Sequence, residues 1–309
     1  MNNNRPRQLC ELLNITRPVL LAPMARIAGG RLAAEVSRSG GLGFLGAGYG
    51  DAGWLDTEMD HVPNGAQIGI GLITWHMADT AIADALGHQP HAIWLSFGDP
   101  TPHLPEISAA GVIAVCQVAR VAEAEVAIRA GAEVIVAQGS EAGGHGQTGR
   151  SLFGLLPEIA ASFPEVPLVA AGAINDEAGL NAALALGAWG VSVGTAFTAT
   201  TEATETDAAK AKLVSTPGDD TIQSRVYDHV RGPLWPEKYV GRSVVTELTD
   251  QWAVSEHDIE KDLEEIRERY VTDVAESNMD RRVLWAGDGI GQIRNLTTAE
   301  AIVQRFPEA

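Results

Sequence analysis

Residues 132–146 read AEVIVAQGSEAGGHG, an apolar run that leads into a glycine-rich run with one histidine. The apolar part predicts a buried β-strand over 133–138. Glycine has no side chain to keep a ligand away from the backbone, and parallel α/β barrels keep their chemistry on the loops that follow their strands. We therefore expect an α/β protein in which His145 stands on an exposed loop beside a ligand, rather than on an ordinary surface turn.

Short apolar runs alternate with helix-like segments on both sides of this stretch. The runs are apolar throughout rather than alternating, which is typical of strands buried on both faces of a parallel sheet. Several helical segments end at a glycine, namely Gly40, Gly131 and Gly187, as expected for a left-handed helix cap. The predicted strands are 18–22, 42–47, 67–73, 92–97, 112–117, 133–138, 167–171 and 190–194, and the predicted helices include 31–39, 77–86, 121–130, 155–162 and 176–186.

About eight strand–helix units in the first ~200 residues predict a (β/α)8 barrel, the TIM barrel fold. A doubly wound sheet is the alternative, but the first strand is followed by Ala22-Pro23-Met24 and not by the glycine fingerprint of dinucleotide-binding folds. After Thr195 the sequence becomes polar and helix-prone. We therefore predict a barrel over 1–200, a small and mainly helical insertion over 201–285, and a C-terminal helix over 286–309 that returns to the barrel.

The composition restricts what this protein binds. The chain has 309 residues, of which 45% are hydrophobic and 20% charged, and its net charge is −18. Such an acidic surface repels phosphate backbones and anionic lipids, so neither nucleic acid nor a membrane is an expected partner. Cys10 and Cys116 form no disulfide framework and the histidines show no metal-ligand spacing, so no metal is expected. The N-terminal segment lacks a secretory apolar region, which predicts a cytoplasmic protein, and a homo-oligomer is compatible with the sequence.

Two small-residue motifs end the last two predicted strands. In TIM barrels the loops after these strands commonly bind phosphate through backbone N–H groups and a helix N-terminus. Small residues would also suit tight turns, but two such motifs at adjacent positions favour phosphate, either of a phosphorylated substrate or of flavin mononucleotide (FMN). The motifs are Ala171-Gly172-Ala173-Ile174 and Ser192-Val193-Gly194-Thr195.

Taken in this order, the motifs resemble those of the nitronate monooxygenases, formerly called 2-nitropropane dioxygenases. That family consists of FMN-dependent TIM barrels that oxidise alkyl nitronates with O2 to carbonyl compounds and nitrite. The flavin-dependent enoyl-ACP reductases and NADH:quinone reductases are similar through the same loops, so the resemblance is less specific to one reaction. It covers most of the chain and is carried by residues 22–24, 138–145, 171–174, 186–195 and 286–291.

The resemblance also implies roles for individual residues. His145 matches the catalytic base or nitronate-binding histidine of the family, and FMN is the implied cofactor. Gly71 stands where the family commonly has an asparagine in its third strand, and Ala173 stands where the phosphate loop usually has a glycine. The residues implied to contact the flavin are Ala22, Pro23, Met24, Gly71, Gln138, Gly143, Gly144, Gly172, Ala173, Ser192, Val193, Gly194 and Thr195.

Other residues are candidates because of their position in the predicted barrel. Trp75 follows the third strand, and Ser96 and Phe97 end the fourth, so we expect all three to line the substrate pocket. Glu141 is expected to brace the glycine-rich loop by accepting backbone hydrogen bonds. Trp235, in the insertion, either closes the site or fills an interface.

The sequence therefore predicts an FMN-dependent oxidoreductase, most simply a nitronate monooxygenase that uses a small-molecule substrate and O2. In that role His145 would hydrogen-bond the nitro group or remove the α-proton of a nitroalkane, because imidazole changes its charge near neutrality. Two alternatives stay open. One is an NAD(P)H-dependent flavin reductase that acts on a quinone or an enoyl thioester, and the other is a non-catalytic barrel that binds flavin or phosphate.

Overall fold

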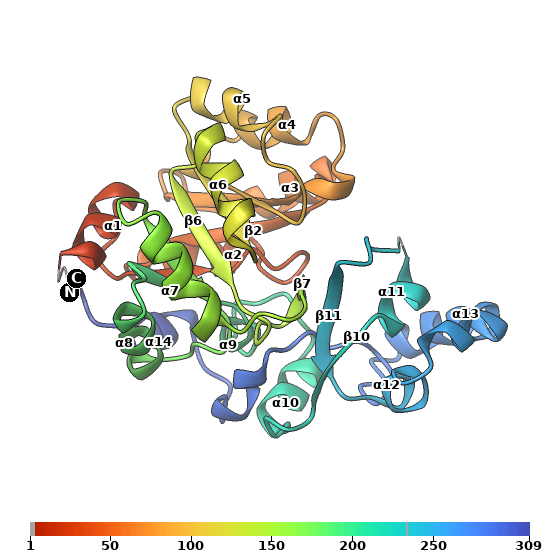
Figure 1. Ribbon diagram of the computed structural model, residues 1–309. Helices are drawn as coiled ribbons and strands as arrows, with labels where there is room; N and C mark the ends of the chain where they lie inside the picture. Colours follow the sequence, from red (N-terminus) through yellow and green to blue (C-terminus); the bar gives the residue numbers. More distant parts are fainter. Residues whose placement is uncertain (1–3, 233) are drawn as a thin grey trace.

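The computed structural model describes residues 4–232 and 234–309. Each apolar run predicted from the sequence supplies one strand of a parallel sheet with the order β1-β9-β8-β6-β5-β4-β3-β2 (Figure 1). The two ends of this sheet meet, because the Leu21 N–H donates to the Leu42 carbonyl at 2.9 Å and the Leu42 N–H donates to the Val19 carbonyl at 3.1 Å. The predicted TIM barrel is therefore confirmed. Its strands are β1 (Val19–Leu21), β2 (Gly43–Gly48), β3 (Ile68–Ile73), β4 (Ala92–Ser96), β5 (Ile113–Val118), β6 (Val134–Gln138), β8 (Leu168–Ala171) and β9 (Gly190–Val193).

Helices connect these strands on the outside of the barrel (Figure 1). The last helix, α14, packs against α2, so the end of the chain lies on the barrel. The helices are α1 (Arg5–Leu13), α2 (Gly30–Arg38), α3 (Ala52–Met59), α4 (Ala81–Gly87), α5 (Leu104–Ala109), α6 (Val121–Ala130), α7 (Leu152–Ser162), α8 (Glu177–Ala185), α9 (Thr195–Thr198), α10 (Asp207–Ser215), α11 (Val226–Arg231), α12 (Glu247–Trp252), α13 (Leu263–Ala275) and α14 (Ala299–Val303), with 3-10 turns η1 (Thr74–His76), η2 (Glu256–Lys261) and η3 (Asp288–Gln292).

The glycines predicted to end helices adopt the expected conformation. Gly40, Gly131 and Gly187 have φ of +103°, +108° and +104°, a region that only glycine enters without strain. The strands between these helices are buried on both faces. Inside the barrel the rings of Phe44 and Trp94 meet edge to face with centroids 5.1 Å apart, and both side chains are buried. The barrel interior is therefore a packed core, and ligands must bind at its ends.

A second sheet joins the insertion to the barrel. Its strands β10 (Thr221–Ser224) and β11 (Tyr239–Val244) pair antiparallel, and β11 pairs antiparallel with β7 (Gly144–Gln147). We expected a mainly helical insertion and did not predict β10 or β11. We expected a loop at the glycine-rich run, and this was wrong for residues 144–147, which form β7. Both strands of the β7–β11 pair are short and lie far apart in sequence, so no local pattern reveals that they pair.

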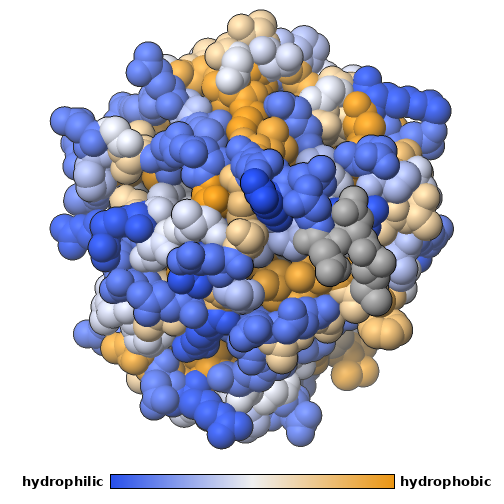
Figure 2. Space-filling model, turned by 90° about the vertical axis from the view of Figure 1, so that its left-hand side faces the viewer, coloured by the Kyte–Doolittle hydropathy of each residue, from blue (hydrophilic) through white to orange (hydrophobic). Residues whose placement is uncertain are grey.

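The insertion also has a small core of its own. Val226, Leu248, Ile259 and Tyr270 are buried together in a cluster separate from the barrel core. In Figure 1 this part, with α10 to α13, stands beside the barrel, on the side away from the chain termini. The face shown in Figure 2 is mostly hydrophilic, with apolar side chains visible between polar ones. The proposed boundaries at residues 200 and 285 remain predictions.

Candidate active site

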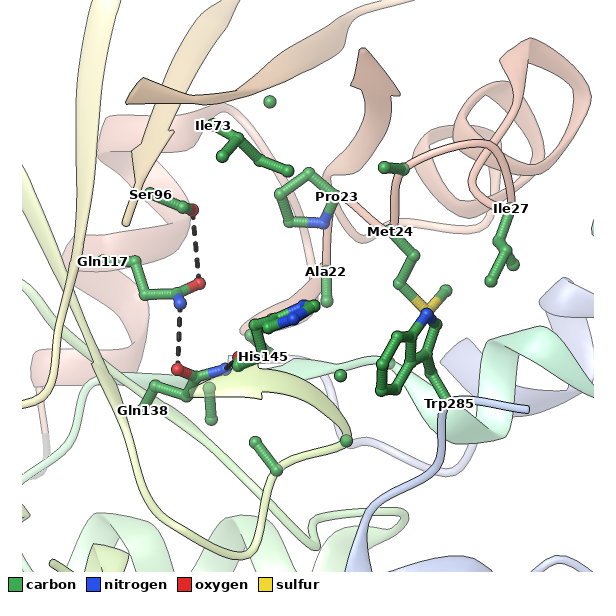
Figure 3. Close-up of a pocket in the computed structure, with 18 of the residues that line it drawn as sticks. Ala22, Pro23, Met24, Ile27, Ile73, Ser96, Gln117, Gln138, His145 and Trp285 are labelled. Atoms are coloured by element: carbon green, nitrogen blue, oxygen red, sulfur yellow. Dashed lines mark hydrogen bonds between the residues drawn. The ribbon is translucent and has the colours of Figure 1, made fainter. Parts of the chain in front are cut away.

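A cavity of about 500 Å³ opens at the carboxyl ends of the barrel strands. In Figure 3 strand-end residues surround it on several sides, and Trp285 from the C-terminal segment lies across from them. Two predicted site residues are absent from the described lining. Val193 is buried in the core, and Trp75 lines a neighbouring cavity instead. The predicted residues that do line the cavity are Ala22, Pro23, Met24, Gly71, Ser96, Phe97, Gln138, Gly143, Gly144, His145, Gly172, Ala173, Ser192, Gly194 and Thr195.

One wall of the cavity is formed where β1 and β3 end. The Ala22 N–H donates to the Val193 carbonyl at 2.9 Å and continues the β1 ladder into the cavity. Pro23 then lies against Gly71, and a Cβ at Gly71 would be 2.1 Å from the Pro23 Cβ. Since real atoms do not approach so closely, the proline ring fills the space that a side chain at position 71 would need. This packing explains why glycine stands there.

Two loops form a rim of small residues at the ends of β8 and β9. Gly172 and Ala173 both have positive φ, +133° and +53°, which turns the chain sharply after β8. Helix α9 begins at Thr195, and the first N–H groups of a helix have no partner within it. The Ser192 hydroxyl oxygen is buried and has no hydrogen-bond partner among the described residues. Small residues and unpaired donors together suit an anion such as phosphate.

The glycine-rich C-terminal motif crosses this rim backbone to backbone. A Cβ at Gly143 would lie 2.5 Å from the Gly287 nitrogen, so neither segment of the backbone has room for a side chain there. The Gly287 N–H donates to Thr195 Oγ1 at 3.0 Å, which leaves the Thr195 hydroxyl hydrogen free to donate elsewhere. Both carboxylate oxygens of Glu141 accept the Leu152 N–H at 3.0 Å, which confirms the bracing role expected for Glu141.

A row of side-chain hydrogen bonds runs across the ends of β4, β5 and β6 (Figure 3). The Ser96 hydroxyl donates to Gln117 Oε1 at 3.4 Å, and Gln117 Nε2 donates to Gln138 Oε1 at 3.0 Å. Gln138 Nε2 then donates to the carbonyl of His145 at 3.0 Å. The row therefore ties β7 to the barrel without any charged group. Gln117 was not among the predicted site residues, although a polar residue that ends a buried strand was a usable signal.

His145 is held far more firmly than the sequence suggested. It lies on β7 opposite Gly241, and its side chain is only 11% exposed, so the expected exposed loop was wrong. His145 Nε2 lies 2.7 Å from Asp228 Oδ1, and the Asp228 side chain is 2% exposed. The Trp235 ring stacks on the imidazole with centroids 3.7 Å apart and planes 6° apart. The insertion therefore supplies both groups that fix the histidine.

Arg225, in the insertion, holds these two groups in place. Its Nη2 donates to the Trp235 carbonyl at 2.6 Å, and its Nε lies 3.9 Å from Asp228 Oδ2. Neither Asp228 nor Arg225 could be predicted from the sequence, because neither lies near His145 along the chain. Trp235 was considered from the sequence, and the structure places it in the lining of the cavity.

Aromatic side chains form the wall beside His145. Trp235 contacts Tyr49 and Trp75, with ring centroids 6.2 and 5.3 Å apart. Burial raises the pKa of Tyr49 to about 12, so its phenol stays neutral and can donate a hydrogen bond near physiological pH. The Arg231 guanidinium lies 5.9 Å from the centre of the Trp285 ring, at the cavity mouth. The wall is thus apolar, with a cation at its edge.

Two other features are absent from the described residues, a metal site and a membrane-spanning helix. Within 4–232 and 234–309, no group of three His, Cys, Asp or Glu side chains is placed to hold a metal ion. In the same described part of the chain, no helix combines the length and apolar character needed to cross a membrane.

Comparisons with known proteins agree with this architecture. A family model described as nitronate monooxygenase matches residues 7–67 and 61–308. A nitronate monooxygenase from Neurospora crassa is 31% identical, and the match covers 94% of this chain and 88% of that protein. FabK from Thermotoga maritima superposes with a TM-score of 0.82 at 26% identity, over 96% of this chain and 94% of that one. A nitroalkane oxidase from Streptomyces ansochromogenes has a TM-score of 0.81 at 24% identity, over 96% and 95% of the two chains.

Proposed function

Because this chain belongs to the nitronate monooxygenase family, we propose that it oxidises alkyl nitronates with O2 to carbonyl compounds and nitrite, with FMN as its cofactor. It is an oxidoreductase built on a TIM barrel. The observation that carries the proposal is the position of His145. Its imidazole faces the same cavity as the small-residue rim, is fixed by Asp228 and Trp235, and is the only histidine among the described lining residues.

The residues around the cavity fit FMN. The rim offers backbone at Gly172, Ala173 and Gly194 with no bulky side chain, and the Thr195 hydroxyl hydrogen is free to donate to a phosphate oxygen. The orphaned Ser192 hydroxyl is buried at the same rim. When bound, a flavin supplies electron acceptance from the substrate and reaction with O2, chemistry that amino-acid side chains lack. No dinucleotide fingerprint accompanies the rim, which favours FMN over FAD.

The chain itself orients the substrate and moves a proton. If the Asp228 carboxylate accepts the proton of His145 Nε2, the lone pair of the imidazole is on Nδ1. Nδ1 can then remove the α-proton of a neutral nitroalkane, and the negative charge of Asp228 stabilises the imidazolium that results. The imidazolium formed in this way then attracts the nitronate anion that the proton removal leaves. Trp235, stacked on the ring, keeps the imidazole from rotating and excludes water from one of its faces.

The proposal is tested with the purified protein in two steps. The flavin is released by denaturation and identified by chromatography, and FAD or no flavin would contradict the cofactor assignment. The intact protein is then mixed anaerobically with ethyl nitronate, with nitroethane and with NADH. Bleaching by the first two supports the proposal. Bleaching by NADH alone would instead indicate the flavin reductase, and no bleaching by any of them would indicate a non-catalytic flavin-binding barrel.

The histidine is tested with His145→Ala in flavin-replete protein. Flavin reduction by nitroethane should slow by about 10²–10⁴-fold, the usual contribution of a positioned base. His257→Ala is a matched control, because that side chain is 82% exposed and is not among the described residues that line the cavity. Unchanged reduction in His145→Ala would remove this residue from the mechanism.

A further inference from the structure

A second cavity of about 560 Å³ adjoins the first, and nothing in the proposed chemistry uses it. The two cavities share three lining residues, Phe97, Gln117 and Gln138. These residues therefore form a common wall between the two cavities. The amides of the two glutamines are fixed by the hydrogen-bonded row described above. Phe97 contributes an aromatic ring to this wall, and that ring contacts other aromatic rings.

Phe97 has an unusual backbone conformation. Its φ is +60°, a left-handed value that costs energy for any residue with a side chain and that tends to persist only where the surroundings impose it. Its ring meets Trp235 and Tyr239 edge to face, with centroids 5.2 and 5.4 Å apart. The ring is thus directed into the partition between the two cavities, against the tryptophan that stacks on His145.

The second cavity is mainly apolar inside and acidic at its rim. Its lining includes Val118, Ala119, Tyr239 and the half-exposed Val126. Its charged lining residues are two carboxylates, Asp99 and Glu123, and one lysine, Lys238, whose ammonium is 3.8 Å from Glu123 Oε1. A hydrogen bond from Thr101 keeps the pKa of Asp99 below its usual range, so this carboxylate stays charged. An anionic group is disfavoured at such a rim, whereas an uncharged hydrocarbon group is accepted.

We propose that the second cavity binds an uncharged alkyl or aryl substituent of the nitronate, and that Phe97 controls its passage from the first cavity. The first cavity has to accommodate both the flavin and the reacting carbon beside His145, so a long substituent needs a separate space. The second cavity shares a wall with the site and can provide this space. This inference rests on the proposed function, of which it specifies the substrate class.

The test compares nitronates of increasing chain length, from ethyl to octyl. In the wild type, kcat/KM should rise by about fourfold for each methylene that enters the apolar cavity. Ala122 is exposed on α6 and lines the second cavity, so Ala122→Trp should occupy part of it and lower the ratio of octyl to ethyl kcat/KM at least about tenfold. Val126→Trp is a second filling variant from the same helix. Ala182→Trp, on the exposed face of α8, is the matched control and should keep the wild-type ratio.

A binding measurement separates this inference from the proposed function. Calorimetry with 1-octanol needs no turnover, and the alcohol should bind the wild type and Ala182→Trp at least about tenfold more tightly than Ala122→Trp. If ethyl nitronate is not oxidised but 1-octanol binds in this pattern, the proposed function fails and the apolar site stands. Equal binding to all three proteins, or a kcat/KM independent of chain length in an enzyme that oxidises ethyl nitronate, would overturn the inference. A filling variant that slows every nitronate equally would also overturn it and indicate a path for O2.

Discussion

Replacing Asp228 by asparagine tests how the insertion acts on the chemistry. Asparagine has the same shape, and its Oδ1 can still accept the His145 Nε2 hydrogen, so Asp228→Asn removes the charge and keeps the contact. The contact is short, 2.7 Å, and the two side chains are only 11% and 2% exposed, so solvent screens it little. A hydrogen bond to a charged group contributes ~1.5–3 kcal/mol, and a neutral one ~0.5–1.5 kcal/mol. The midpoints of these ranges differ by about 1.3 kcal/mol, which corresponds to a rate change of about tenfold.

The loss should depend on the substrate. Proton removal from nitroethane creates an imidazolium that Asp228 stabilises, so anaerobic flavin reduction by nitroethane should slow about tenfold. Ethyl nitronate needs no proton removed, so the rate of flavin reduction by ethyl nitronate should decrease clearly less. The assay is stopped-flow absorbance on flavin-replete protein, with thermal unfolding as the check on folding. Asp250→Asn, at an exposed position of α12, is the matched control.

Two results would refute this reasoning about Asp228. An unchanged rate with nitroethane would mean that the carboxylate only fills space beside the imidazole. An equal loss with both substrates, together with a lower unfolding temperature, would mean that Asp228 stabilises the insertion rather than the reaction.

Three further predictions follow from the packing and the buried thiols. Gly194→Asp should abolish FMN retention, because its carboxylate repels the phosphate. Gly194→Ala should retain FMN, because a Cβ there meets no atom closer than 3.5 Å. Equal flavin occupancy in the two variants would argue against a phosphate at this loop. Gly71→Ala should lower the free energy of unfolding by about 1–3 kcal/mol, since the new Cβ overlaps Pro23, and an unchanged urea midpoint would contradict this. Burial raises the pKa of the Cys10 and Cys116 thiols from 9.0 to about 12. Above pH 9 the unfolded chain therefore loses these protons while the folded chain keeps them. The urea concentration at the unfolding midpoint should decrease as the pH is raised from about 8 to about 10, and it should decrease less in the double Cys→Ala variant.

Local sequence determined the barrel for two reasons. A parallel strand that is buried on both faces needs an unbroken apolar run, and a chain that reverses direction after a helix needs a residue in the left-handed conformation at the end of that helix. Both features are visible within short stretches of sequence. Examples are the apolar runs at 92–97 and 133–138 and the helix-ending glycines Gly131 and Gly187. Chain direction then placed all carboxyl ends at one edge. This is why the sequence predicts that Gln138 and Gly172 lie at the same end of the barrel, where both line the cavity.

Tertiary structure alone decided what surrounds His145. Its run of glycines reads as a loop, and it becomes a strand only because β11, far along the chain, pairs with it. Asp228 and Trp235 reach the imidazole through the same folded insertion. Likewise the sequence does not explain why Gly71 stands where the family commonly has an asparagine, whereas the structure shows that Pro23 fills the space beside it. Sequence periodicity reports contacts between neighbours along the chain, whereas these contacts depend on which distant segments the closed barrel and its insertion bring together.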